Sequence, residues 1–314
     1  MSRPPRNPLI PTLNGVSPSV VALPCQPPGQ TPWTTVADYL AWRLPAVSLQ
    51  QWCERMASGA VLTVDGQTLP PETPFRAGMR VHYWRAQPDE PAAPGPVHIL
   101  FRDDHLLVAD KPHFMPVTPS GAYVQRSLLV QLKRLTGVDT LSPIHRIDRE
   151  TAGLVVFSCR PQDRDAYQAL FRKRQVHKRY EAIAPTGTSP LPAVRHSRIV
   201  EDPDAFFRMR EVEGEPNSQT WLSAGESRRG LTRYALEPVS GRRHQLRVHL
   251  WGLGRPICGD SFYPVVLRGP GEPDDRSQPL RLLAAEMAFT DPVTGQQRHF
   301  ATSASLSWPD GAGA

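Results

Sequence analysis

Asp148 lies between two arginines, Arg146 and Arg149, in a polar segment near the middle of the chain. An apolar run over residues 154–157 follows, which predicts a loop that leads into a buried strand. Neighbouring guanidinium groups favour the ionised form of a carboxyl group. An ionised carboxylate on a loop that a rigid strand supports suits a nucleophile or a general base.

Two other interpretations apply to the same segment. An Arg-x-Asp-Arg sequence can form a salt-bridged turn with no catalytic role. The order His145, Arg146, Asp148 is also similar to the catalytic loop of protein kinases. Kinase chemistry further needs a Gly-rich phosphate loop, a lysine in a Val-Ala-Ile-Lys-like strand and an Asp-Phe-Gly segment. The sequence contains none of these three, which excludes a kinase.

The composition is typical of a soluble globular protein, with 39% hydrophobic and 21% charged residues. The 314 residues suffice for one large domain and a smaller one, and the net charge of +6 favours an anionic partner. No apolar run reaches the roughly 20 residues that cross a bilayer, and the N-terminus lacks the apolar core of a signal peptide. We therefore expect a cytoplasmic protein without membrane contact.

Changes in composition divide the chain into four parts. Residues 1–30 are rich in proline and are predicted to form a flexible arm. Residues 31–86 predict two helices and two strands, and residues 87–96 predict a stiff Pro-rich linker. Residues 97–310 form the largest predicted domain.

The helices within residues 31–86 are predicted to begin at the caps Thr35 and Ser48. Together with the strands that follow, they resemble an S4-like RNA-binding module. The helices of such modules usually carry several basic residues, whereas Arg43 and Arg55 are among the few present here. A purely structural role for this part of the chain therefore stays open.

The large domain alternates between strand and helix patterns. Residues 97–101 and 106–109 predict a hairpin, residues 162–175 a helix with an exposed basic end, and residues 206–209 a short strand. The basic end of that helix suits either a solvated face or a rim that contacts phosphate. A further helix, over residues 125–135, is predicted to turn four leucines inward: Leu128, Leu129, Leu132 and Leu135.

Two more polar segments carry candidate functional residues. Lys178 and Tyr180 begin a predicted strand, where a tyrosine usually belongs to the core. Arg242, His244 and Arg247 follow a Ser-Gly turn at the entrance of a predicted helix, which on its own suits an exposed basic helix.

Residues 145–154 resemble the motif His-Arg-Leu-Asp-Arg-x-Thr-Ser-Gly-Leu of the RluA-type pseudouridine synthases, with Ile147 and Ala152 as the two departures. The Lys-x-Tyr-x-Ala segment at residues 178–182 matches that family as well. So does its Arg-Thr-Gly-Arg-x-His-Gln-Ile-Arg-x-His segment, at residues 239–249, with Val239 and Ser240 in place of its first Arg and Thr. The resemblance implies an α+β pseudouridine synthase fold, in which helices flank a mixed, mainly antiparallel central sheet.

The resemblance also implies roles for individual residues. Asp148 would be the catalytic aspartate, Tyr180 would stack on the target uracil, and Arg247 would pair with Asp148 in the resting site. The remaining residues of the implied site would bind substrate, with Leu283 packing under the base: His145, Arg146, Arg149, Lys178, Arg242, His244 and Leu283. The family usually has a histidine where Ala284 stands, so any role of that histidine is absent here.

The implied reaction breaks the N1–C1′ bond of a uridine, rotates the uracil and rejoins it through C5. It involves no redox step, so we expect no cofactor and no metal, and the four cysteines contain no Cys-x-x-Cys pair that would indicate zinc. The target base must leave its stack. We expect a monomer that acts on ribosomal or transfer RNA, with the target uridine and the attacking atom left open.

Two alternatives come from other functional classes. A non-catalytic RNA-binding protein on the same scaffold would be favoured by loss of Asp148 or Tyr180, and both are present. A hydrolase that acts on nucleosides or glycosides usually needs a second acid at the site. We identify no second acid in the motifs, which disfavours it.

Overall fold

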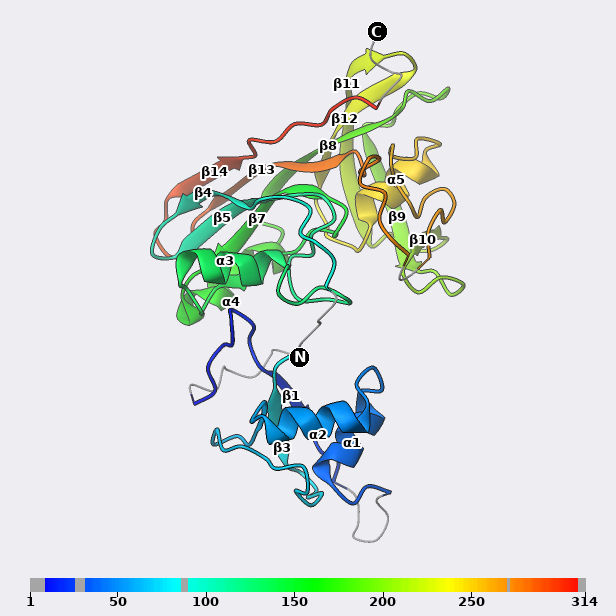
Figure 1. The fold of residues 1–314 in the computed structure, drawn as a ribbon. Helices are drawn as coiled ribbons and strands as arrows, with labels where there is room; N and C mark the ends of the chain where they lie inside the picture. Colours follow the sequence, from blue (N-terminus) through cyan, green and yellow to red (C-terminus); the bar gives the residue numbers. More distant parts are fainter. Residues whose placement is uncertain (1–8, 26–31, 86–89, 270–271, 310–314) are drawn as a thin grey trace. The chain divides into compact units, whose positions relative to one another are not determined.

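The computed structural model describes residues 9–25, 32–85, 90–269 and 272–309. The chain divides into two units, Met1–Glu90 and Pro91–Ala314 (Figure 1). The predicted linker, residues 87–96, falls partly outside the described residues.

The first unit contains two short helices and a small antiparallel sheet. Helix α1 (Val36–Arg43) and helix α2 (Leu49–Ala57) begin at Thr35 and Ser48, and both caps form complete capping boxes, as the sequence predicts. Strands β1 (Ser19–Ala22), β2 (Val61–Leu62) and β3 (Arg80–Tyr83) follow the order β1-β3-β2.

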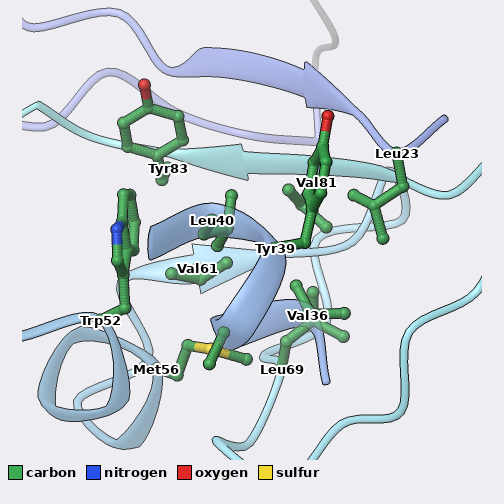
Figure 2. Close-up of a cluster of buried hydrophobic side chains, with 11 residues drawn as sticks. Leu23, Val36, Tyr39, Leu40, Trp52, Met56, Val61, Leu69, Val81 and Tyr83 are labelled. Atoms are coloured by element: carbon green, nitrogen blue, oxygen red, sulfur yellow. The ribbon is translucent and has the colours of Figure 1, made fainter. Parts of the chain in front are cut away.

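The core of the first unit lies between these helices and the sheet (Figure 2). Trp52 is fully buried and meets the ring of Tyr83 edge-on, with 5.1 Å between the ring centroids. Leu40 and Met56 pack into the same cluster. This unit therefore has its own apolar core.

The prediction of a flexible arm is wrong for residues 9–25, the part of the arm that the structure describes. Strand β1 pairs with β3, and Ile10 and Leu23 are buried. The β-branched pair Val20 and Val21 supplies strand propensity that the surrounding prolines obscure in the sequence. Residues 1–8 and 26–30 of the arm lie outside the described residues.

The second unit is built on one large sheet of order β10-β9-β11-β12-β8-β13-β7-β5-β4, with β14 beside β13 and β6 beside β7. Its strands are β4 (His98–Arg102), β5 (Leu106–Lys111), β6 (Ser142–Pro143), β7 (Ala152–Ser158), β8 (His177–Pro185), β9 (Val194–Glu201), β10 (Met209–Val212), β11 (Ser218–Arg228), β12 (Leu231–Pro238), β13 (Leu282–Thr290) and β14 (Gln297–Ala301). The pairs are antiparallel except β13 with β7. The prediction of a mixed, mainly antiparallel sheet is confirmed.

Helices cover both faces of this sheet: α3 (Leu128–Thr136), the short η1 (Pro161–Asp163) with α4 (Arg164–Arg172), and α5 (Gln245–Gly252). In β7, Leu154 and Val156 pack with α4, whereas Val155 and Phe157 pack with α3. Because successive side chains of a strand point to opposite faces, a strand covered on both sides is apolar throughout. This explains the uninterrupted apolar run after the Asp148 loop.

Two sequence predictions need local correction. The helix predicted from residue 125 begins at Leu128, and Leu135 is exposed rather than inward, because it falls on the solvent side of the short helix. The strand predicted over residues 206–209 begins only at Met209, and Phe206 and Phe207 lie in the turn before it.

Gly153 lies where β7 passes closest to β13, with φ +105°, and a Cβ there would stand 2.3 Å from the carbonyl oxygen of Ala284. We expect Gly153→Ala to lower the free energy of unfolding by roughly 3–5 kcal/mol, through backbone strain and overpacking. Gly137→Ala is the matched control, because Gly137 also has positive φ but open space around it. Chemical denaturation should show a loss of only roughly 1–2 kcal/mol for the control. Equal losses would contradict the close approach.

Candidate active site

A cavity of about 1590 Å³ opens on the second unit and gathers the predicted site residues from distant segments. Asp148 comes from the loop before β7, Lys178 and Tyr180 from β8, and Arg242 and His244 from the turn before α5. A recess of about 100 Å³ joins these residues with Arg247 and Leu282.

Arg247 is buried at the base of this recess and organises three carboxylates. Its Nε and Nη2 donate to the two oxygens of Asp260 at 2.8 and 2.6 Å. Its Nη1 donates to Asp148 Oδ2 at 3.4 Å and lies 3.7 Å from Glu150 Oε2. Burial alone lowers the pKa of Arg247, but Asp260 outweighs it and the pKa is raised. The predicted contact with Asp148 is present, and Asp260 is the closer partner.

Asp148 is the most accessible of these three carboxylates, with a side chain 25% exposed compared with 10% for Glu150 and 0% for Asp260. Within the described chain, no ion pair joins it to Arg146 or Arg149. Arg146 and Arg149 therefore form no salt-bridged turn with Asp148, and neither is the cation that pairs with its carboxylate. The cation beside Asp148 is Arg247, which lies 99 residues later in the sequence.

Arg149 lines the cavity, and carboxylates hold its guanidinium group. Its guanidinium donates to both oxygens of Asp274, at 2.5 and 2.8 Å, and also contacts Glu150 and the ring of Tyr123. Burial alone lowers the pKa of Arg149, but the hydrogen bond to Asp274 and the charges of Glu150 and Asp274 together outweigh burial, and the pKa is raised. Its donors serve Asp274 and Glu150, and its role in substrate binding stays a prediction.

His145 also positions the loop. Its Nε2 accepts a hydrogen bond from the backbone N–H of Val156 at 3.1 Å, and its ring stacks on Phe171. Burial, with Lys178 nearby, lowers the pKa of His145 to about 3, so the ring is neutral at physiological pH. His145 thus anchors the loop on β7 and also lines the cavity, and its role in substrate binding stays a prediction.

His244 and Tyr180 face the recess from opposite elements. His244 has φ +54° and lies within hydrogen-bond distance of the Tyr263 hydroxyl through Nδ1 (3.0 Å), and its Nε2 lies 3.9 Å from Asp148. Burial, then Arg247 and Arg243, lower the pKa of His244 to about 3. Burial and then the Asp148 charge raise the pKa of Tyr180, so its hydroxyl stays protonated.

The predicted apolar floor is displaced by one residue. Leu282 lines the recess and packs near Tyr180, whereas Leu283 packs on the other side of the sheet, with Ile183 and Leu306. The assignment of Leu283 is therefore wrong. The physical reason is the two-residue period of a strand, which sends adjacent leucines to opposite faces.

The basic residues of the rim are only partly free. Lys178 Nζ donates to Ser240 O at 3.2 Å, and burial, with Arg174 nearby, lowers its pKa to about 8. Arg242 Nε donates to Asn217 O, while its remaining guanidinium surface is exposed. Arg146 is exposed on the cavity and has no hydrogen bond or ion pair to other described residues.

Sequence reasoning missed two carboxylates and one lysine. Asp260 stands in the Gly-Asp pair after α5, a signal that was available, and Glu150 lies within the central motif, so the statement that no motif holds a second acid is wrong. Lys111 is buried. Its Nζ donates to Pro112 O at 2.9 Å and Arg149 O at 3.0 Å beneath the Asp148 loop.

The described residues contain no cluster of three or more acidic, histidine or cysteine side chains able to hold a metal. Over the same ranges, none of the helices has the length and apolar character needed to cross a bilayer.

Burial lowers the pKa of Lys111 from 10.5 to about 7. Between these values the unfolded chain binds more protons than the folded chain, so the contribution of Lys111 to stability rises with pH across that window. We therefore expect the free energy of unfolding of the wild type, measured by urea denaturation, to rise from pH 7 to pH 9 relative to that of Lys111→Met. A difference that stays constant would show that Lys111 keeps its charge. All other titrating groups are shared by the two proteins, so their effects cancel in this comparison.

Comparison with known proteins identifies the family. Residues 105–251 match the family model described as RNA pseudouridylate synthase. An uncharacterized RNA pseudouridine synthase of Synechocystis is 31% identical over 74% of this chain and 79% of its own length. The ribosomal large subunit pseudouridine synthase D of Xanthomonas campestris is also 31% identical, over 82% and 81%.

A solved structure shares the fold. Human RNA pseudouridylate synthase domain containing 4 superposes with a TM-score of 0.53 and 28% identity, covering 67% of this chain and 88% of the human chain. Sequence and structure therefore agree that this chain belongs to the RluA-type RNA pseudouridine synthase family and is an isomerase that acts on RNA.

Proposed function

We propose that Asp148 is the catalytic carboxylate with which this enzyme converts specific uridines of ribosomal or transfer RNA into pseudouridine. The observation that carries the proposal is the arrangement of three carboxylates around Arg247. Asp260 is buried with two short bonds to Arg247 and Glu150 is buried against Arg149, whereas Asp148 is partly exposed, faces the recess and has one long contact with Arg247. It is therefore the carboxylate that substrate can reach.

The isomerisation needs little besides such a carboxylate and a site that holds the free base. The N1–C1′ bond breaks, the uracil rotates, C5 bonds to C1′, the C5 proton leaves and N1 takes up a proton, so the product has the same atoms as the substrate. Asp148 supplies the ionised carboxylate that acts on the sugar or the base and then assists loss of the C5 proton. Arg247 keeps its charge and holds Asp148 through one long hydrogen bond to Oδ2.

Tyr180 and Leu282 belong to the apolar lining of the recess, where the target uracil would be held after leaving its stack. Both are carried by strands of the central sheet, which limits their movement. Leu282 takes the role that the sequence assigned to its neighbour.

The rim of the cavity suits the phosphates that flank the target. Arg146 and Arg242 are exposed there, and Lys178 lies beside them at half burial. Guanidinium groups bind phosphate through paired hydrogen bonds, so these residues would hold the RNA backbone while His244 borders the target nucleotide.

The remaining assignments follow from the family and the sequence. We propose that the first unit is an S4-like RNA-binding module, that the unit from Pro91 onward is the catalytic domain, and that the protein acts as a cytoplasmic monomer. The nucleoside hydrolase alternative is weaker, because Glu150 and Asp260 are tied to arginines instead of facing Asp148 across an open space.

Asp148→Asn should abolish isomerisation while preserving RNA binding, because it removes the charge and keeps the shape. We expect the rate to fall by roughly 10³-fold or more. RNA from cells with the gene deleted and then restored is mapped by carbodiimide-dependent reverse-transcription stops. A stop that returns with the wild type but not with the variant supports the proposal.

The control for this experiment is Asp165→Asn, which makes the same change on the exposed surface of α4. It should restore the stop. A stop that Asp148→Asn also restores would contradict the catalytic assignment. If deletion removes no stop while the purified protein still binds RNA, the non-catalytic alternative is favoured.

Tyr180→Phe should keep most activity, because the phenyl ring can still stack on uracil and the hydroxyl stays protonated throughout. We expect a loss of roughly tenfold or less for Tyr180→Phe and of roughly 10- to 200-fold for Tyr180→Ala. Tritium release from RNA labelled at uridine C5 measures both variants. Equal losses would mean that the hydroxyl, rather than the ring, is what the reaction needs.

A further inference from the structure

An exposed phenylalanine stands at the rim of the cavity on the turn between β9 and β10. Phe206 lines the cavity and is 75% exposed, the highest fraction among the large apolar side chains of the described residues. Isolated exposed apolar residues are common and need no explanation by themselves. The position of this ring does need an explanation, because it lies at the entrance of a site that must receive an unstacked RNA strand.

The turn that carries Phe206 is held rigidly. Arg243 donates to Phe206 O at 3.0 Å through Nη1 and to Phe207 O at 2.8 Å through Nη2. Arg208, at the end of the turn, packs over the rings of Trp251 and Tyr263. An aromatic ring presented on a fixed backbone loses little conformational entropy on binding.

A continuous row of rings connects Phe206 with the proposed reaction centre. Phe206 meets Phe207 edge-on at 5.5 Å between centroids, and Phe207 lies 5.2 Å from Phe262. Phe262 is in turn stacked with His244 at 5.9 Å, and His244 Nε2 lies 3.9 Å from Asp148 Oδ2. Phe206 is therefore the outer end of the row, too far out to hold the target uracil itself.

The surroundings of Phe206 favour a nucleic-acid base over an apolar protein partner. The guanidinium group of Arg243 holds the turn, whereas Arg242 and Arg146 are exposed on the same cavity. A ring among exposed guanidinium groups is the usual composition of a single-stranded RNA surface, in which cations hold the phosphates and aromatic rings stack on bases.

We propose that Phe206 is a stacking platform for an unpaired base that flanks the target uridine. The inference rests on the proposed function of the Asp148 recess. When the target nucleotide enters that recess, its neighbour loses a stacking partner, and the Phe206 ring replaces it. Phe206 thereby contributes to the choice of uridines in single-stranded loops.

The test compares Phe206→Ala, Phe206→Leu and Phe206→Tyr in the full-length protein. The substrate is total RNA labelled at uridine C5 with tritium, prepared from cells that lack the gene, and the readout is tritium release. We expect Phe206→Ala and Phe206→Leu to lower kcat/KM by roughly 5- to 150-fold, through KM, and Phe206→Tyr to remain close to the wild type. Trp221→Ala is the control, since Trp221 is an exposed ring on β11 away from the cavity.

A leucine as effective as phenylalanine would show a generic apolar contact and would overturn the stacking role. An unchanged KM in Phe206→Ala would also overturn the stacking role. In both cases an active wild type would leave the proposed function intact. A wild type that releases no tritium would instead defeat the proposed function, and this inference with it. As a second measurement, 2-aminopurine placed beside the mapped uridine in a short RNA should be quenched by Asp148→Asn protein and not by the Asp148→Asn, Phe206→Ala double variant.

Discussion

The buried charge of Arg247 is the constraint on which the site depends. A guanidinium taken out of water must be matched by carboxylates and hydrogen bonds, because leaving it uncompensated costs several kcal/mol. Asp260 meets that need with two short bonds, and Glu150 adds a weaker contact. Asp148 is then an additional carboxylate beside a cation that is already paired. It is oriented by Arg247 but not neutralised by it, which suits a group that must act on substrate.

The sheet supplies the rigidity that this arrangement requires. Strand β7 leaves the Asp148 loop and passes against β13 at Gly153, where a larger residue would meet the backbone of Ala284. The same strand β13 carries Leu282, and its other neighbour, β8, carries Tyr180. Two strand contacts therefore fix the distances between the carboxylate loop, the apolar floor and the aromatic ring.

Sequence reasoning predicted what depends on local patterns and missed what depends on long-range packing. The caps Thr35 and Ser48 and the apolar run after Asp148 are local signals, and the elements they predict are present. Adjacent leucines in a strand do not reveal which of them faces a cavity, so Leu283 was chosen in place of Leu282. Burial of Lys111 was likewise invisible, because its partners are backbone carbonyls, one of them 38 residues away.

A structure of the Asp148→Asn protein bound to an RNA that contains the mapped uridine tests the central claim most directly. The account predicts a flipped uridine whose uracil lies between Tyr180 and Leu282, with the side chain of residue 148 within hydrogen-bond distance of the nucleotide and Arg247 still paired with Asp260. A target uridine held outside this recess, or an Arg247 that leaves Asp260 to bind the RNA, would contradict it.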